Sequence, residues 1–315
     1  MTLLHTSTAL GIVATISVGL TGCVLNNPTT GEAISVTSSA TECTLSATEA
    51  PSGTVQFEVV NSGDVTTEFY ILANDGMRVV GEVENIGPGL SRNLLIQASA
   101  GTYYTVCKPG GASAGIGNAV FTVTESGAEV ALSADTQALV DTAAANYASY
   151  VRNEIDLLTA ETEVFAASYV AGDLDLARSL YAPTRMHWER VETVAESFGD
   201  LDPKLDLREA DLEEGQEWTG WHAIEKDLWP QDADAGFQAY DQAKRERLAG
   251  LLVTDTLTLQ SNVQDLTFDL TQLTNGAIGL LDEVATGKVT GEEEIWSHTD
   301  LWDFQANVDG AAVLY

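Results

Sequence analysis

The side chains of this sequence best suited to binding a metal ion or to catalysis are histidines that lie near carboxylates. The three histidines after residue 23 are His187, His222 and His298, and each lies near acidic residues and tryptophan. His222 stands three residues before Glu225, and Glu294 stands four before His298, so each pair would share one helix face. Helical bundles build metal sites from inward-facing Glu and His at these spacings, with carboxylates from neighbouring helices. The pattern therefore predicts a metal site in a helical domain.

Several interpretations of these residues stay open. A mixed set of imidazole and carboxylate ligands suits Fe, Mn or Zn better than Cu(I), which prefers thiolate and thioether. The histidines could instead be core residues that donate to a carboxylate or a carbonyl, because buried polar groups need partners. Glu225 could be the general base of a metallopeptidase, although the H-E-x-x-H motif of zinc peptidases is absent. Trp218 and Trp221 could form a stacking platform for a polysaccharide or a partner protein.

In the first half of the chain the candidate metal ligands are cysteines and acidic residues, because residues 24–134 contain no histidine. A blue-copper electron carrier needs two His with its Cys, so that function is excluded. Cys43 and Cys107 could form a disulfide, which would close an interval of 64 residues (107 minus 43) and stabilise the fold by roughly 3–4 kcal/mol. Alternatively, their thiolates bind a metal ion together with Glu68 or Glu84. The sequence does not separate these two possibilities.

Charge and composition limit the partners. The chain has 315 residues, with 47 Asp plus Glu against 14 Lys plus Arg and a formal net charge of −33. This balance excludes nucleic acid as a partner, because binding a phosphate backbone requires clustered basic residues. Hydrophobic residues make up 44% of the chain, which argues against a disordered acidic polypeptide. The acids are dispersed, as is typical of a solvated surface.

The N-terminus carries an export pattern. The apolar stretch 10–20, about 11 residues long, is too short to span a bilayer, which needs roughly 20, and it fits the core of a secretory signal. The run Leu20-Thr21-Gly22-Cys23 resembles a bacterial lipobox, although residues 1–9 carry no Lys or Arg. We therefore expect a signal peptide over residues 1–22, lipidation of Cys23, a tether over 23–31 and anchoring to the outer side of the cell membrane.

Two different hydrophobic periods divide the remaining chain. Residues 32–126 contain about seven short β-rich runs separated by turn signals such as Pro51-Ser52-Gly53, which indicates a β-sandwich. After a linker over 127–134, residues 135–315 have the composition and spacing of an antiparallel helical bundle. The expected helices are 138–171, 174–198 with a bend near Pro183, 218–229, 236–270, 275–286 and a last one from about Glu292. The polar segment 199–217 is expected to wrap the surface.

Long motifs in both halves resemble a known family. In the helical half they are the runs 181–192 (YAPTRMHWERVE), 218–225 and 297–307, and in the sandwich half they are 67–69, 84–89 and Cys107. Together they are similar to the EfeO family, the extracytoplasmic iron-binding component of EfeUOB uptake systems. The resemblance covers nearly all of the chain after residue 23. It implies a cupredoxin-like β-sandwich followed by an all-α imelysin-type domain.

The resemblance also implies two metal sites and a role in delivery. His222 and Glu225 match the family's HxxE signature, and the residues expected around them are His187, Glu189, Glu192 and Asp303. The residues that match a proposed second site in the sandwich are Cys43, Glu68, Glu84 and Cys107. The implied function is not catalysis but capture of iron, as Fe²⁺ or Fe³⁺, with Cu²⁺ or Zn²⁺ as alternative ions.

The partners implied by the resemblance are a membrane iron permease and a haem peroxidase of the same system. Members of the family continue beyond the position that matches Tyr315. This difference leaves open whether the helical domain is complete.

Overall fold

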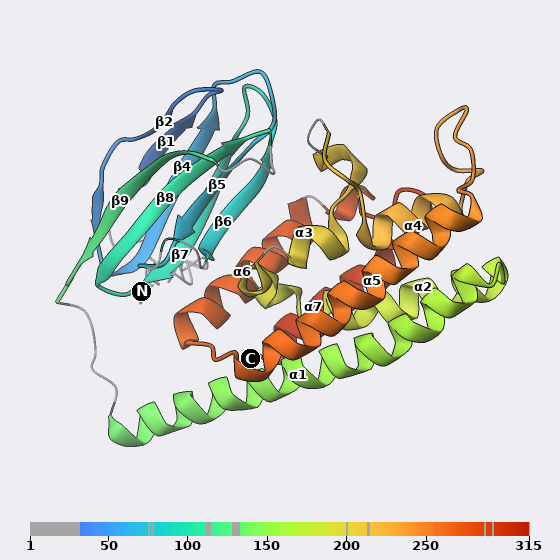
Figure 1. Cartoon of the computed structure of the whole chain (residues 1–315). Helices are drawn as coiled ribbons and strands as arrows, with labels where there is room; N and C mark the ends of the chain where they lie inside the picture. Colours follow the sequence, from blue (N-terminus) through green and yellow to red (C-terminus); the bar gives the residue numbers. More distant parts are fainter. Residues whose placement is uncertain are drawn as a thin grey trace, which may run out of the picture.

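The computed structural model describes residues 32–74, 76, 79–110, 115–127, 133–199, 201–212, 215–286, 288–291 and 293–314. The expected signal peptide, tether and lipidated Cys23 lie outside these residues. Figure 1 shows a β-sandwich formed by the first part of the chain and a helical domain formed by the second. The fold class expected from the sequence is confirmed. The exact domain limits stay a prediction, with the last described strand ending at Thr124 and the first helix starting at Ala134.

The sandwich consists of two sheets. The first has the strand order β2-β1-β4-β7 and the second the order β3-β9-β8-β5-β6. The strands are β1 (Ile34–Ser38), β2 (Cys43–Leu45), β3 (Glu49–Pro51), β4 (Gly53–Asn61), β5 (Thr67–Leu72), β6 (Val79–Ile86), β7 (Ser91–Ala98), β8 (Gly101–Pro109) and β9 (Ile116–Thr124). The described residues thus contain two more strands than expected. The additional β2 and β3 have three residues each, too few to show a period of two in the sequence.

Alternation of apolar residues builds the core between the sheets. In β4, Val55, Phe57 and Val59 are buried, because side chains two residues apart point to the same face of a sheet. The ring of Phe57 lies 5.4 Å from the rings of Phe69 and Phe121, which belong to the opposite sheet. These aromatic contacts fix the packing of one sheet on the other.

A disulfide also ties the two sheets together. Cys43 in β2 and Cys107 in β8 are bonded, with their Cα atoms 5.7 Å apart. Of the two possibilities that the sequence left for these cysteines, the structure has the covalent one. Sulfur atoms in a disulfide are not thiolates, so Cys43 and Cys107 are not metal ligands in this state.

Replacing both cysteines should destabilise the sandwich selectively. The variant Cys43→Ala/Cys107→Ala should lose about 3–4 kcal/mol of unfolding free energy, because the bond closes a loop of 64 residues. Urea unfolding followed by tyrosine absorbance, to which Tyr70, Tyr103 and Tyr104 of the sandwich contribute, should report the loss. Tryptophan fluorescence should change less, because all six tryptophans lie after residue 187. Thr44→Ala, on the same strand, is the control, and equal shifts in the two variants would contradict the prediction.

The helical domain begins with a 37-residue helix, about 55 Å long, that runs beside α2 and α5 (Figure 1). The helices are α1 (Ala134–Val170), α2 (Leu174–Glu189), α3 (Leu201–Asp206), α4 (Gly220–Leu228), α5 (Gln242–Asn262), α6 (Leu270–Thr286) and α7 (Asp300–Ala312). Short 3₁₀ turns are η1 (Glu192–Phe198), η2 (Glu209–Asp211), η3 (Val263–Asp265) and η4 (Lys288–Thr290). Among the described residues, no helix is long and apolar enough to cross a membrane.

Several of the expected helix boundaries are wrong, and the helix expected over 275–286 begins five residues earlier, at Leu270. The helix expected over 174–198 continues through Pro183 but ends at Glu189, and Val194 in the following turn has non-helical backbone angles. The last helix begins at Asp300 rather than near Glu292, because residues 293–299 form turns. The helix expected over 236–270 is shorter at both ends and corresponds to α5 (Gln242–Asn262). The break after Glu189 follows a buried acidic side chain, and the turn before Asp300 contains buried acidic side chains.

Aromatic packing orients α2 toward the centre of the helical domain. The ring of Phe165 in α1 lies 6.0 Å from that of Tyr181 in α2 and 5.0 Å from that of Trp221 in α4. All three rings are fully buried. Residues four apart share a helix face, so the inward direction of Tyr181 also points Arg185 and Glu189 inward.

The two domains contact each other through α6, which packs against the edge strands β6 and β7 (Figure 1). The side chain of Asn275 accepts from the backbone N–H of Gln97 at 2.8 Å and donates to its carbonyl at 3.0 Å. Asn275 is buried. An amide thus satisfies the open backbone groups of an edge strand, which otherwise invite pairing with another chain.

Removing this amide should weaken the contact between the domains. Asn275→Ala should cost about 1–2 kcal/mol, because two hydrogen bonds to Gln97 are lost. The urea transition detected by tyrosine, which is present in both domains, should differ more from the transition detected by tryptophan, which is present only in the helical domain, than it does in the wild type. Thr274→Ala, at a half-buried position of α6 next to Asn275, is the control. A variant indistinguishable from this control would show that the amide does not hold the domains together.

Candidate metal centre

Buried charged groups converge inside the helical domain. They come from α2, η1, α3, α4, η4, α7 and the turn 293–299, and we call them the acid cluster. Its carboxylates are Glu189, Glu192, Asp206, Glu225, Glu293, Glu294 and Asp303, and its basic groups are Arg185, His222 and Lys288. Only Glu192 and Asp206 keep a modest exposure.

The imidazole of His222 lies between two groups of carboxylates. Its Nδ1 is 3.2 Å from Glu225 Oε2, as expected for residues three apart on a helix. Its Nε2 is 3.4 Å from both Asp206 Oδ1 and Glu293 Oε1. Two sets of ligand atoms are close enough to share one cation, the first formed by Asp206, His222 and Glu293 and the second by His222, Glu225 and Glu294.

Backbone donors hold Glu225 in place. The N–H groups of Trp296 and Ser297 donate to Glu225 Oε1 at 3.0 and 2.7 Å. The turn 293–299 therefore folds around the carboxylate, and this contact also places Glu293 and Glu294 beside His222. A tertiary contact thus explains why these residues are not helical.

Two glycines allow the elements of the cluster to approach closely. A Cβ atom at Gly220, at the start of α4, would lie 2.2 Å from the carbonyl oxygen of Leu205 in α3. A Cβ atom at Gly310 in α7 would lie 2.2 Å from the carbonyl oxygen of Arg190. Only glycine fits at such distances. The first contact brings α4 against the helix that carries Asp206, and the second brings α7 against the end of α2.

Lys288 compensates one end of the cluster. Its Nζ donates to both oxygens of Glu192 at 2.6 and 2.7 Å and to Glu189 Oε2 at 3.4 Å. Asn307 donates to the same two carboxylates, at 2.6 Å to Glu192 and 3.0 Å to Glu189. The ammonium and the amide together hold this pair of acids.

Negative groups outnumber positive ones in the cluster. Fully ionised, its seven carboxylates exceed its three basic groups by four charges, and an uncompensated charge is costly in a protein interior. Burial, followed by the charge of Glu225, raises the pKa of Glu294 to about 8. Burial likewise raises the pKa of Glu192 to about 7 and that of Asp303 well above its usual range. The excess is therefore relieved by bound protons or by a cation.

Other members of the cluster stay ionised. Burial and Arg185 would lower the pKa of His222, but Glu225, Glu293 and Asp206 outweigh them and raise it to about 10. Burial would raise the pKa of Glu293, but Lys288, His222 and the nearby Arg208 hold it well below its usual range. Adjacent carboxylates, Glu293 and Glu294, thus have opposite shifts because of the cations around each.

Asp303 has the least satisfied carboxylate of the cluster. It is fully buried, and neither oxygen has a hydrogen-bond partner among the residues that the structure describes. The nearest cationic atom is Arg185 Nε, 3.8 Å away. Buried polar atoms are rarely left unpaired, so this carboxylate fits a site that takes up a cation.

Comparisons with known proteins agree with this architecture. A family model described as imelysin matches residues 143–315, and one described as a cupredoxin-like domain matches residues 12–115. The chain is 40% identical over 281 residues to "Iron uptake system component EfeO" of Yersinia pestis, covering 88% of this chain and 71% of that protein. It is 38% identical over 266 residues to the protein of the same name from Escherichia coli O1:K1 / APEC, covering 82% of this chain and 66% of that protein. The chain belongs to the EfeO family.

The structure brings most of the residues expected from the EfeO resemblance together. His222, Glu225, Glu189, Glu192 and Asp303 all lie in the acid cluster. Whether they bind metal stays a prediction.

His187 lies apart from them. It follows Arg185 by two residues and therefore points to the opposite face of α2. There its Nδ1 lies 2.7 Å from Glu154 Oε2 and its Nε2 lies 3.6 Å from Glu161 Oε1, both in α1.

One expectation about the histidines is wrong, and one of the open interpretations of the tryptophans is excluded for Trp221. His298 does not share a helix face with Glu294, because it lies in a turn with a backbone φ of 56° and is exposed, while Glu294 is buried. Trp221 cannot stack on a polysaccharide, because it is fully buried in the core. Trp218 is half-buried and packs against Trp296 at 5.7 Å.

Several members of the cluster are absent from the sequence-based set of metal ligands. The segment 199–217 was expected to wrap the surface, but it supplies Asp206, whose helix also buries Leu201 and Leu205. Those two leucines, four residues apart, were the available indication of a packed helix. Arg185, Glu293 and Lys288 were not singled out, because no local spacing marks residues that meet only in the fold.

The four residues expected to form the EfeO metal site in the sandwich are divided between two faces. Cys107 points into the core between the sheets, as does Phe69, its partner in the β5–β8 register. Glu68 lies on the opposite face, where the Tyr70 hydroxyl oxygen is 2.9 Å from both Glu68 Oε2 and Glu84 Oε1 and can donate its one proton to either. The two glutamates are therefore brought together, whereas the cysteines are joined in the disulfide.

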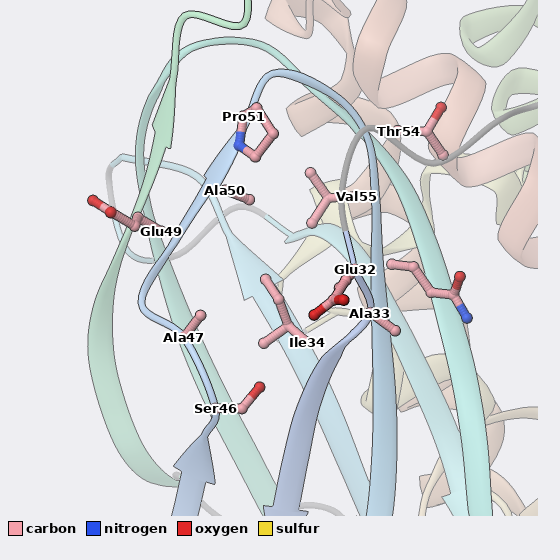
Figure 2. Close-up of a pocket in the computed structure, with 11 residues that line it drawn as sticks. Glu32, Ala33, Ile34, Ser46, Ala47, Glu49, Ala50, Pro51, Thr54 and Val55 are labelled. Carbon is pink, nitrogen blue, oxygen red and sulfur yellow. The ribbon is translucent and has the colours of Figure 1, made fainter.

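The sandwich also has a hollow of about 360 Å³ near its N-terminal end (Figure 2). Ala47, Ala50 and Val55 line much of it, and Glu32 and Glu49 lie on different sides of the hollow. No histidine or cysteine lines it. This hollow therefore lacks the converging ligands found in the acid cluster.

The raised pKa values of the buried carboxylates lead us to expect that the free energy of unfolding depends on pH. A raised pKa means that the folded protein keeps a proton that the unfolded chain releases at a lower pH. The stabilisation from Glu294 is complete below its ordinary pKa of 4.5 and is lost as pH rises through about 8. Without added metal, the free energy of unfolding should therefore fall between about pH 5 and about pH 8. Urea titrations across this range measure the effect.

Glu294→Gln should make this fall smaller, because the variant cannot release that proton while its carbonyl can still face Arg185. Glu163→Gln, which removes an exposed carboxylate of α1, is the control and should leave the fall unchanged. An unchanged pH dependence in Glu294→Gln would mean that Glu294 is already ionised in the folded protein.

Proposed function

We propose that this protein captures iron outside the cytoplasm and passes it to a membrane permease. The observation that carries the proposal is the excess of carboxylates over cations in the acid cluster, in a member of a family whose curated relatives are named iron uptake components. A divalent or trivalent cation would relieve this excess by replacing the protons that Glu294, Glu192 and Asp303 otherwise hold.

The donor atoms favour iron. The cluster offers carboxylate oxygens and one imidazole, a set of ligands that suits iron, manganese or zinc. In both candidate sets, His222 supplies the nitrogen ligand and the other ligands are oxygens. Either set around His222 supplies two carboxylates to one imidazole nitrogen. We assign iron as the transported ion, with Zn²⁺ and Cu²⁺ as competitors for the same groups.

Export and anchoring complete the proposed route. We propose that residues 1–22 direct export, that lipidation of Cys23 anchors the protein to the cell membrane, and that an iron permease and a haem peroxidase are its partners. The net charge of −33 supports capture, because a negative field raises the local concentration of cations. A tethered carrier beside a permease needs to diffuse only a short distance to deliver its ion.

Capture fits the site better than peptide hydrolysis. A general base must reach a water molecule, but Glu225 is fully buried and one of its oxygens accepts two backbone N–H groups. The other oxygen faces His222. We therefore propose that the imelysin-type domain of this protein binds a metal ion without catalysing hydrolysis.

Iron titration of variants tests the proposal. His222→Ala and Glu225→Gln should each weaken Fe²⁺ binding by at least about tenfold, because each removes a donor from the cluster. Glu192→Gln should also weaken binding, since it removes one charge near the ion. The measurement is anaerobic calorimetric titration of the purified chain with Fe²⁺.

His187→Ala is the matched control, because it removes a histidine of α2 that faces α1, away from the acid cluster. Equal affinities in the wild type, His222→Ala and Glu225→Gln would refute the acid cluster as the iron site. Metal-dependent cleavage of casein by the wild type, lost in Glu225→Gln, would favour a metallopeptidase instead.

A further inference from the structure

Arg185 occupies the centre of the acid cluster. Its guanidinium is fully buried and forms ion pairs with five carboxylates from four separate stretches of chain. They are Glu189, Asp206, Glu293, Glu294 and Asp303, with Nε 2.6 Å from Glu294 and 3.8 Å from Asp303, and Nη2 3.8 Å from Glu293. Aromatic packing of Tyr181 one turn earlier fixes its direction.

The partners of Arg185 are also the candidate ligands of the metal ion. Asp206 and Glu293 belong to the first set around His222, and Glu294 belongs to the second. An ion bound by either set must therefore draw on carboxylates that already face the guanidinium. Lys288 is different, because its shortest contacts are with Glu192 and it approaches those sets only through Glu293 at 3.8 Å.

A purely structural ion pair does not account for this arrangement. One guanidinium has five N–H groups and commonly serves one or two carboxylates in a bidentate manner. Here its single charge is shared among five acids, and Nε makes no well-aligned hydrogen bond despite its short distance to Glu294. The guanidinium thus neutralises many groups partly rather than one group well.

The charge of Arg185 cannot be removed when a metal ion arrives. Arginine stays protonated in proteins, whereas His222 can lose its proton to become a ligand. Two positive charges a few ångströms apart in a buried site repel each other strongly. The same guanidinium that stabilises the metal-free cluster must therefore oppose the metal-bound one.

We propose that Arg185 is a built-in counter-cation that competes with iron for the carboxylates around His222 and keeps the affinity low enough for release. This proposal rests on the proposed function. It assigns Arg185 as a positioning residue that does not touch the ion. In the metal-free protein it keeps the acids gathered and hydrogen-bonded, and in the loaded protein its repulsion favours transfer of the ion to the next acceptor.

Substitution of Arg185 tests this role. Arg185→Gln keeps hydrogen-bonding capacity but removes the charge, and it should bind Fe²⁺ at least about tenfold more tightly than the wild type. Release to a chelator in stopped-flow experiments should slow by a similar factor. Arg185→Lys keeps the charge and should bind iron with nearly wild-type affinity.

Arg245→Gln is the matched control. Arg245 is a largely buried arginine that pairs with Asp227, a fully buried carboxylate of α4, outside the acid cluster. Its removal should leave the iron affinity unchanged. Equal or weaker Fe²⁺ binding in Arg185→Gln, with the fold intact by circular dichroism, would overturn the proposal.

A measurement on the wild type covers the case in which Arg185→Gln does not fold. The ¹⁵Nε–H resonance of Arg185, assigned by its loss in Arg185→Lys, should shift when diamagnetic Zn²⁺ is added, because its carboxylate partners turn to the ion. The resonance of Arg245 should not shift. An unmoved Arg185 resonance at saturating Zn²⁺ would also overturn the proposal.

The two proposals fail in different ways. If the wild type and His222→Ala bind Fe²⁺ equally or not at all, the iron site itself is wrong. If His222→Ala weakens binding while Arg185→Gln does not strengthen it, the site stands and only the role of Arg185 is rejected.

Discussion

The helical domain depends on one electrostatic constraint, the burial of more carboxylates than cations. Each charged group in the acid cluster is tolerable only because another group faces it. Arg185 connects α2, α3, the turn 293–299 and α7, while Lys288 connects η4 to the end of α2 and to η1. Burial raises the pKa of Glu294, Glu192 and Asp303, so protons on these carboxylates can offset part of the remaining negative charge.

The same constraint explains the irregular segments of the domain. The chain breaks its helical course after Glu189 and again at residues 293–299, and at both places carboxylates turn toward the cluster. Gly310 permits the close approach of α7 to the backbone just after Glu189, and Gly220 permits that of α4 to α3. Local departures from helix are thus stabilised by tertiary interactions, which outweigh intrinsic helix propensity.

The sandwich and the helical domain are stabilised by different interactions. The sandwich closes its two sheets with an aromatic core and a disulfide, whereas the helical domain relies on a long scaffold helix and an inner network of charges. The amide of Asn275 joins the two by pairing with the edge of β7. On the sandwich, Glu68 and Glu84 form a separate acidic pair around Tyr70, and that pair does not include the cysteines.

The amino-acid sequence alone determined the two domains, because periods of two and of 3.6 residues are local properties of the chain. It also identified the pair His222 and Glu225, since residues three apart on a helix must be neighbours. Only the tertiary structure decided that Asp206, Glu293 and Arg185 join this pair, that His187 faces away and that His298 is exposed. These residues are separated by loops of variable path, and which of them meet depends on how buried charges from distant segments neutralise one another, a condition that no local spacing records.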